Sequence, residues 1–222
     1  MIKSVVWTSM LDYPKEISTT LFIGECNWNC EYCHNKDLVK LSNINFKNEI
    51  LPKLLKRKEI IKHVVLSGGE CTCYNKINEL IKVLKQNNFI IGIHTNGSNP
   101  NILKENIDKI NYIGMDIKTS KEKYYLIIKE QLDFNLIIDS MKLIIKSNVK
   151  YEFRTTLYPK YVNTNDCIKI AQLIKNLGGN NYVIQQFNNC NVENYNVIPY
   201  STEEIIKIKY ECDKIIPTII RD

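Results

Sequence analysis

The sequence of 222 residues predicts an α/β fold with a parallel sheet, in a single domain that spans residues 1–222. Short runs of β-branched and aromatic residues alternate with amphipathic runs, which is typical of parallel strands joined by helices. The chain is long enough for one filled core and too short for two. It shows neither an internal repeat nor a low-complexity linker. The alternation allows an open sheet as well as a partial or full barrel.

Six short apolar runs predict the strands, and the first three of them end directly before glycine or asparagine. In a parallel sheet the active-site groups lie at the carboxyl ends of the strands, so the residues that follow these runs are the candidate site. The predicted strands are Thr19–Ile23, His63–Ser67, Phe89–Thr95, Tyr112–Lys118, Tyr151–Leu157 and Tyr182–Phe187.

Apolar residues spaced three and four positions apart predict helices between and after these strands. Ser201 and Glu204 form a possible capping box at the start of the last helix. The apolar faces are Ile77, Leu80, Ile81 and Leu84; Ile137, Met141, Ile144 and Ile145; Ile170, Leu173, Ile174 and Leu177; and Ile205, Ile208, Cys212 and Ile215.

Composition and charge argue against nucleic-acid-binding, membrane-spanning and exported proteins. The net charge is +6, but the lysines are spread along the chain, so we expect no nucleic-acid partner. No apolar run approaches the roughly 20 residues of a membrane span, and the segment from Met1 to Trp7 lacks the apolar region of a signal peptide. We therefore expect a cytoplasmic protein without membrane association. Eight cysteines in such a chain favour metal or redox chemistry over disulfides.

The segment after the first predicted strand holds three of these cysteines, Cys26, Cys30 and Cys33, spaced by three and two residues. Three thiolates in one loop can wrap one face of a metal cluster. A [4Fe–4S] cluster normally takes four cysteine ligands. Three ligands leave one iron open, and a reacting ligand needs an open coordination site.

Other interpretations of this segment stay open at this point. Cys30, Cys33 and His34 form the C-x-x-C-H signature of c-type haem, but that interpretation leaves Cys26 without a role. A zinc site could use the three cysteines with His34 or Cys71 as the fourth ligand. Three simply buried cysteines are the last alternative, although a polar loop with three asparagines is a poor place to bury them. The cluster is the interpretation that we favour.

The cysteine spacing, with Tyr32 at the aromatic position before Cys33, resembles the radical S-adenosylmethionine (SAM) superfamily. Within it, the chain resembles the activating proteins of anaerobic ribonucleoside-triphosphate reductases over nearly its whole length. The segments that carry this resemblance are Leu11-Asp12-Tyr13-Pro14, Ser67-Gly68-Gly69-Glu70, Thr95-Asn96-Gly97-Ser98, Met115-Asp116-Ile117-Lys118, Tyr151-Glu152-Phe153-Arg154-Thr155-Thr156 and Tyr182-Val183-Ile184-Gln185-Gln186-Phe187.

The chain departs from the family at one place. The proline that usually follows Glu70 is replaced by Cys71, and Thr72 and Cys73 come next. The departure puts the rigidity of this backbone in doubt and places two extra thiols near the cluster. We interpret both thiols as incidental.

The resemblance implies a partial (β/α)6 TIM-like barrel of parallel strands. It implies a [4Fe–4S] cluster on Cys26, Cys30 and Cys33, and SAM bound to the open iron through its methionine amino and carboxylate groups. One electron from the reduced cluster then breaks the C5′–S bond and gives methionine and a 5′-deoxyadenosyl radical.

The resemblance also implies contacts to SAM. Gly68, Gly69 and Glu70 would hold the methionine ammonium, while Asp116 and Lys118 would lie near SAM. Arg154 is the candidate for the methionine carboxylate, with a structural ion pair to Glu152 or Asp116 as the alternative. Asn96 would bond a ribose hydroxyl or serve as a turn residue. Tyr32 and His34 flank Cys33 and could contact adenine.

The implied function is an activase. It would use the radical to abstract a Cα hydrogen from a glycine of a partner glycyl radical enzyme, the anaerobic ribonucleoside-triphosphate reductase. Flavodoxin or ferredoxin would supply the electron. A radical SAM enzyme acting on a small molecule or peptide is the nearest alternative, and a zinc-binding interaction module is a more distant one.

Overall fold

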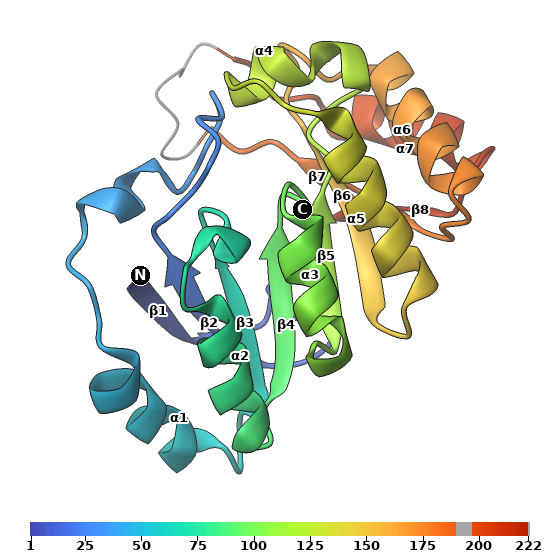
Figure 1. Cartoon of the computed structure of the whole chain (residues 1–222). Coiled ribbons are helices and arrows are strands. Elements are labelled where there is room, and N and C mark those ends of the chain that lie inside the picture. Colours follow the sequence, from blue (N-terminus) through green and yellow to red (C-terminus); the bar gives the residue numbers. More distant parts are fainter. Residues whose placement is uncertain (190–196, 222) are drawn as a thin grey trace.

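In the computed structural model, which describes residues 1–189 and 197–221, eight strands form one sheet in sequence order. The first strand runs antiparallel to the second, and all later neighbours are parallel. The first and last strands do not pair, so the sheet stays open (Figure 1). The strands are β1 (Ile2–Ser9), β2 (Ser18–Ile23), β3 (His63–Gly68), β4 (Ile90–Thr95), β5 (Tyr112–Asp116), β6 (Lys150–Leu157), β7 (Tyr182–Gln186) and β8 (Thr218–Arg221).

The predicted α/β class and the mostly parallel sheet are confirmed, and every predicted strand is present. The sheet has two further strands at its edges, β1 and β8, so the count of six was too low. Most of β1 is only partly buried, and β8 has four residues, so neither gives a strong apolar pattern. The strand predicted to reach Lys118 ends at Asp116, and Ile117 and Lys118 begin the next loop.

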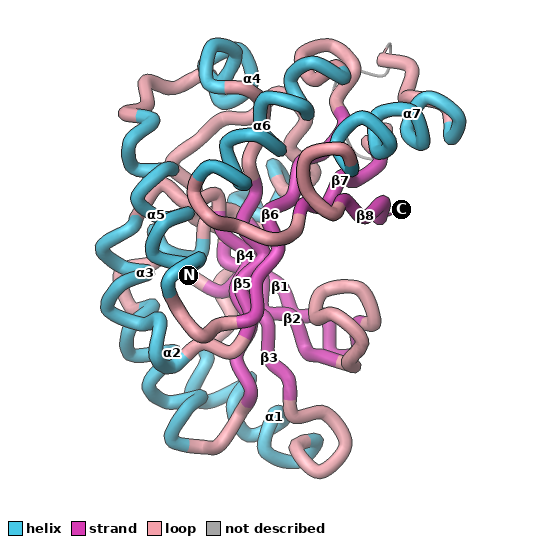
Figure 2. Tube along the Cα trace, turned by 90° about the vertical axis from the view of Figure 1, so that its right-hand side faces the viewer, coloured by secondary structure: helices cyan, strands magenta, loops and turns pink. Residues whose placement is uncertain are grey.

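The helices cover one face of the sheet, and Figure 2 shows α2, α3 and α5 lying along it. The buried residues of α2 are the four apolar residues that the sequence pattern named. The capping box of Ser201 and Glu204 is confirmed, although Ile215 lies beyond the end of its helix. The helices are α1 (Leu51–Arg57), α2 (Ile77–Gln86), α3 (Pro100–Asn106), α4 (Tyr124–Ile128), α5 (Phe134–Lys146), α6 (Thr164–Asn176) and α7 (Thr202–Asp213). In the described part of the chain, no helix has both the length and the apolar character needed to cross a membrane.

The other face of the sheet is apolar near the amino ends of the strands. Tyr13, in the turn between β1 and β2, packs its ring against His63 and Tyr112, with centroids 4.5 and 5.2 Å apart. Gly92 lies between Val65 and Tyr112 in the register of β3, β4 and β5. A Cβ there would lie 3.1 Å from the Tyr13 ring. The missing side chain of Gly92 therefore makes room for Tyr13.

The same face becomes polar toward the carboxyl ends of the strands. Asp116 and Arg154 are direct partners in the pairing of β5 with β6, and the Arg154 Nε donates to Asp116 Oδ1 at 2.9 Å. Gly114 admits the guanidinium, because a Cβ there would lie 2.8 Å from its carbon. On β4, His94 is 3.2 Å from the hydroxyl of Ser67. Burial and the charge of Arg154 lower the pKa of His94 to about 3, so its ring is neutral.

Lys118 completes a buried charge cluster, with its Nζ 3.0 Å from Asp116 Oδ2. The side chains of Arg154 and Lys118 are only 7% and 15% exposed. Burial raises the pKa of Asp116, but the two cations outweigh burial and hold that pKa well below its ordinary value. Asp116 is therefore ionised throughout the neutral range.

Gly92→Ala should lower the free energy of unfolding by about 2 kcal/mol, because the added methyl crowds the rings of Tyr13 and Tyr112. Urea denaturation of the two proteins measures the difference. The matched control is the same substitution made in Tyr13→Ala, where the ring nearest to the added methyl is absent. Equal losses in both backgrounds would show that the Tyr13 contact places no special demand on Gly92.

Asp116→Asn should cost about 3 kcal/mol of stability at pH 7, because Arg154 and Lys118 would then lack their counter-charge. The depressed pKa of Asp116 stabilises the fold above the unfolded value of about 3.9, and this contribution falls as the pH drops below it. The difference between wild type and variant should therefore shrink as the pH falls from about 4 toward 2. Denaturant unfolding across this range, with Asp139→Asn as the exposed control, measures it. A difference that does not change with pH would contradict the charge role.

Candidate active site

The cysteine loop, residues 24–35, follows β2 at the carboxyl edge of the sheet. Cys26 is exposed, Cys30 is buried, Cys33 is intermediate, and all three are free thiols. Burial raises the pKa of Cys30 to about 12, although the nearby Lys118 ammonium opposes the rise. Cys30 is therefore a protonated thiol at neutral pH until a bound metal displaces its proton.

The end of β3 packs directly against the cysteine loop. The amide of Gly69 donates to Ile23 O and that of Glu70 to Glu25 O, both at 2.7 Å. A Cβ on Gly69 would lie 3.0 Å from the Cβ of Cys26, and Gly68 has a φ of +112°. Only glycine tolerates this approach and this conformation. Of the two predicted glycines, Gly69 therefore lies beside Cys26, and Gly68 lies against the backbone of Ile23.

Glu70 is fully buried, and its carboxylate connects two loops. It accepts hydrogen bonds from the amide and hydroxyl of Thr72 at 3.0 and 2.6 Å. It also accepts from the hydroxyl of Thr95 at 2.7 Å and the amide of Asn96 at 2.5 Å. These four donors hold the end of β3 against the end of β4. A hydrogen bond from a methionine ammonium to Glu70 would add to these four hydrogen bonds.

Both polar atoms of the Asn96 side chain form hydrogen bonds within the protein. Its Nδ2 donates to Asn27 Oδ1 at 3.0 Å, and its Oδ1 accepts from the amide of Ser98 at 2.9 Å. Asn27 in turn donates to the hydroxyl of Ser98 at 2.8 Å. This is the turn role that the sequence left open for Asn96, and it also connects the β4 loop to the cysteine loop. The bridging role of Asn27 was not predicted, since a loop asparagine gives no sign of its partner.

The ring of Tyr32 is 4% exposed and lies 5.0 Å from the ring of Tyr158, centroid to centroid. The Lys118 ammonium is 5.9 Å from the centre of the Tyr32 ring. Burial raises the pKa of the Tyr32 hydroxyl, which stays protonated. Among the described residues this buried hydroxyl has no hydrogen-bond partner. Such a donor costs stability unless a ligand satisfies it, so Tyr32 fits the edge of a binding site.

His34 points toward the segment that follows β7. Its Nε2 is 2.8 Å from Asn188 O, and its ring is 6.2 Å from that of Phe187. The next residue, Asn35, donates from its amide nitrogen to Gly68 O at 2.6 Å. The structure therefore places the His34 ring against Asn188 and Phe187, and it puts Asn35, which was not among the predicted site residues, against the β3 turn.

The described residues contain no group of three or more His, Cys, Asp or Glu side chains arranged to hold a single metal ion. His34 and Cys71, the fourth zinc ligands considered, are engaged elsewhere, since the Cys71 thiol donates to His94 O at 3.3 Å. A cuboidal cluster is wider than one ion, so its three cysteine ligands need not converge on one point. The donor set therefore fits an iron–sulfur cluster better than tetrahedral zinc. Cys190 lies outside the described residues.

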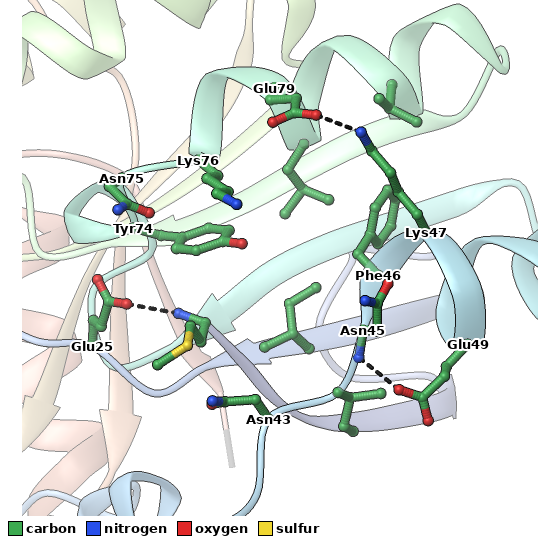
Figure 3. A pocket seen from close by; sticks show the side chains of 15 residues that line it. Glu25, Asn43, Asn45, Phe46, Lys47, Glu49, Tyr74, Asn75, Lys76 and Glu79 are labelled. Atoms are coloured by element: carbon green, nitrogen blue, oxygen red, sulfur yellow. Dashed lines mark hydrogen bonds and ion pairs between the residues drawn. The ribbon is translucent and has the colours of Figure 1, made fainter.

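A cavity of about 600 Å³ lies beside the cysteine loop, between residues 43–49 and α2 (Figure 3). Glu25 and Tyr74 line part of this cavity. Lys47 and Glu79 also line it and form an ion pair of 2.7 Å. The cavity lining includes none of the three clustered cysteines. The cavity is therefore a neighbour of the candidate site and separate from its chemistry.

Solved structures share this fold. The structure of TYW1 with a lysine–pyruvate adduct has a TM-score of 0.66 at 20% identity, and the match covers 90% of this chain and 74% of that one. A domain of pyruvate-formate lyase-activating enzyme from Bacteroides vulgatus has a TM-score of 0.59 at 12% identity, covering 72% of this chain and 98% of that one.

Relatives are also found by sequence. A Methanocaldococcus jannaschii protein named as a glycyl-radical enzyme activating enzyme is 31% identical over 196 residues, covering 84% of this chain and 80% of that protein. The pyruvate formate-lyase-activating enzyme of Clostridium pasteurianum is 27% identical over 216 residues, covering 93% and 84%. The family model of the radical SAM superfamily matches residues 20–174, which include the cysteine loop and the polar end of the sheet. The chain therefore belongs to the radical SAM superfamily of enzymes.

Proposed function

We propose that this protein is a radical SAM activase that generates a glycyl radical on a partner anaerobic ribonucleoside-triphosphate reductase. The observation that carries the proposal is the placement of three cysteines, in one braced loop, beside the charge cluster of Asp116, Arg154 and Lys118. The names of the archaeal and clostridial relatives support an activating enzyme. The choice of reductase rests on the segments that resemble its activating proteins.

Cys26, Cys30 and Cys33 would hold a [4Fe–4S] cluster and leave one iron for SAM. Bound together, the two cofactors supply a 5′-deoxyadenosyl radical. The partial exposure of the loop suits this role, because Cys26 lies at the surface while Cys30 is buried next to Lys118. We propose flavodoxin or ferredoxin as the electron donor and the cytoplasm as the location.

Lys118 is the residue that we assign to the methionine carboxylate. The sequence analysis gave that role to Arg154, with an ion pair to Asp116 as the alternative, and the structure contains the ion pair. Burial lowers the pKa of Lys118, but Asp116 outweighs it and raises that pKa well above its ordinary value. The ammonium has three N–H donors and uses one on Asp116. The others can serve a ligand carboxylate, while Arg154 holds Asp116 in place.

The charges in this cluster also favour a carboxylate group on the ligand. Arg154 and Lys118 carry two positive charges against the single negative charge of Asp116, which leaves one positive charge in a site that is mostly buried. A buried excess charge is costly unless a counter-charge arrives. The carboxylate group of a bound ligand would supply it. The charge cluster therefore suits a ligand carboxylate.

Cys30→Ala should abolish reductive cleavage of SAM, because two cysteines cannot hold a cluster with one open iron. The assay is anaerobic: the protein is reconstituted with iron and sulfide, given dithionite and SAM, and 5′-deoxyadenosine is quantified. Cys73→Ala is the control, since it removes a thiol from the neighbouring turn and should retain product formation. Product formation by Cys30→Ala at the wild-type level would contradict the proposed ligand set.

The partner assignment predicts a glycyl radical on the reductase. Wild-type activase, SAM, reductant and a reductase with a C-terminal glycyl-radical loop should give a protein-bound radical by electron paramagnetic resonance (EPR) spectroscopy. Replacing the reductase's radical glycine by alanine should remove the signal. If 5′-deoxyadenosine forms and no radical appears on the reductase, the substrate is a small molecule or peptide, and this part of the proposal fails.

A further inference from the structure

Glu31 lies inside the cysteine motif, between Cys30 and Tyr32, and its side chain is 12% exposed. Its carboxylate accepts a hydrogen bond from the Tyr158 hydroxyl at 2.9 Å and from the Tyr161 hydroxyl at 3.2 Å. The Lys160 ammonium donates to it at 2.6 Å. All three donors belong to the β6–α6 loop, residues 158–163. One acidic side chain therefore joins the cysteine loop to a segment more than half the chain away.

Two ammonium groups face the Glu31 carboxylate. That of Lys160 lies 2.6 Å from one of its oxygens. The ammonium of Lys129 lies 3.6 Å from the second carboxylate oxygen. The contact is therefore a charge-assisted one with several donors, which is stronger than an isolated surface ion pair.

The backbone of the same segment is held from another side. The amides of Asn29 and Glu31 donate to Ile128 O and Ile127 O at 3.0 and 3.1 Å. These carbonyls belong to the last turn of α4, which Lys129 ends with a φ of +58°. The residues around Cys30 are thus held by main-chain hydrogen bonds to α4 and by side-chain hydrogen bonds from the β6–α6 loop to Glu31.

Tyr158 contacts both residues that lie between Cys30 and Cys33. Its hydroxyl bonds Glu31, and its ring packs on the ring of Tyr32 at 5.0 Å and on that of Phe187 at 4.9 Å. Glu31 and Tyr32 are the two residues that separate Cys30 from Cys33. Both of them rest against Tyr158, which is fully buried. The distance between two of the three thiols therefore depends on this contact.

We propose that Glu31 is a positioning residue for the cluster, clamping the Cys30–Cys33 segment to the β6–α6 loop so that two of the three thiols are already placed before metal binds. The inference rests on the proposed function, because it assumes a cluster on these cysteines. Glu31 touches no reacting atom in this assignment. It acts through its neighbours, as outer-shell partners of metal ligands do.

The test compares wild type with Glu31→Ala, Glu31→Gln and Tyr158→Phe after anaerobic reconstitution. Iron content and the rate at which a chelator bleaches the cluster absorbance are measured, together with the EPR spectrum of the reduced cluster with and without SAM. Glu31→Ala should lose iron about tenfold faster than wild type and give an altered EPR spectrum. Glu31→Gln should recover part of the difference, because its amide oxygen still accepts from the two hydroxyls but carries no charge for Lys160.

A double-mutant cycle shows whether Tyr158 acts through Glu31. Tyr158→Phe alone should speed iron loss modestly, because it removes one donor and keeps the ring. Added to Glu31→Ala it should change nothing further, since the hydroxyl has already lost its acceptor. Asp37→Ala is the matched control: it removes an exposed carboxylate, paired with Lys40, four residues after Cys33. It should behave as wild type.

Two results would overturn the inference. One is iron loss and an EPR spectrum in Glu31→Ala equal to those of wild type; the other is full additivity of Glu31→Ala and Tyr158→Phe. If Glu31→Ala does not fold, as judged by the circular dichroism of the metal-free protein, Glu31→Gln and Tyr158→Phe carry the comparison. Wild type that takes up no cluster removes the proposed function and this inference together. A stable wild-type cluster that is indifferent to Glu31 removes the inference alone.

Discussion

The carboxylate of Asp116 lies between the guanidinium of Arg154 and the ammonium of Lys118, and the polar end of the sheet is organised around it. The parallel register of β5 and β6 makes Asp116 and Arg154 neighbours, and Gly114 leaves the space that the guanidinium fills. A side chain at this position would displace the guanidinium, because its Cβ would lie 2.8 Å from the guanidinium carbon. The result is a group of charges with one positive charge in excess, close enough to Cys30 to interact with it electrostatically.

The loops at this edge hold one another in place through hydrogen bonds. Glu70 connects the ends of β3 and β4, Asn27 reaches Ser98 after β4, and Glu31 reaches the residues after β6. Each contact involves a different part of the cysteine loop or the turn beside it. A loop held at several points loses less conformational freedom when metal binds, because the protein has already ordered it. For the proposed cluster, the protein would thus supply a preorganised ligand set rather than a flexible one.

The sequence predicts those features that depend on local pattern. Apolar runs identify the six central strands, and the cysteine spacing identifies the family, since both are properties of neighbouring residues. The edge strand β1 was not predicted because one of its faces is solvated. The sequence also leaves Arg154 open between a ligand carboxylate and an ion pair, because the pairing of Arg154 with Asp116, 38 residues away, depends on the strand register. Glu31 gives no signal at all, since a glutamate in a polar loop looks like a surface residue. Its role depends on donors more than 120 residues later in the chain.

The replacement of the family's proline by Cys71 does not loosen the turn after Glu70. Hydrogen bonds supply the rigidity that a proline ring would give: the Cys73 amide donates to Glu70 O at 3.0 Å, and the Tyr74 amide donates to Cys71 O at 3.2 Å. The side chain of Thr72 adds its bond to Glu70. The Cys71 thiol is buried against His94 O, and that of Cys73 accepts from Asn99 at 3.5 Å. Both extra thiols of the turn therefore form hydrogen bonds, and the proposed ligand set stays with the three thiols of the cysteine loop.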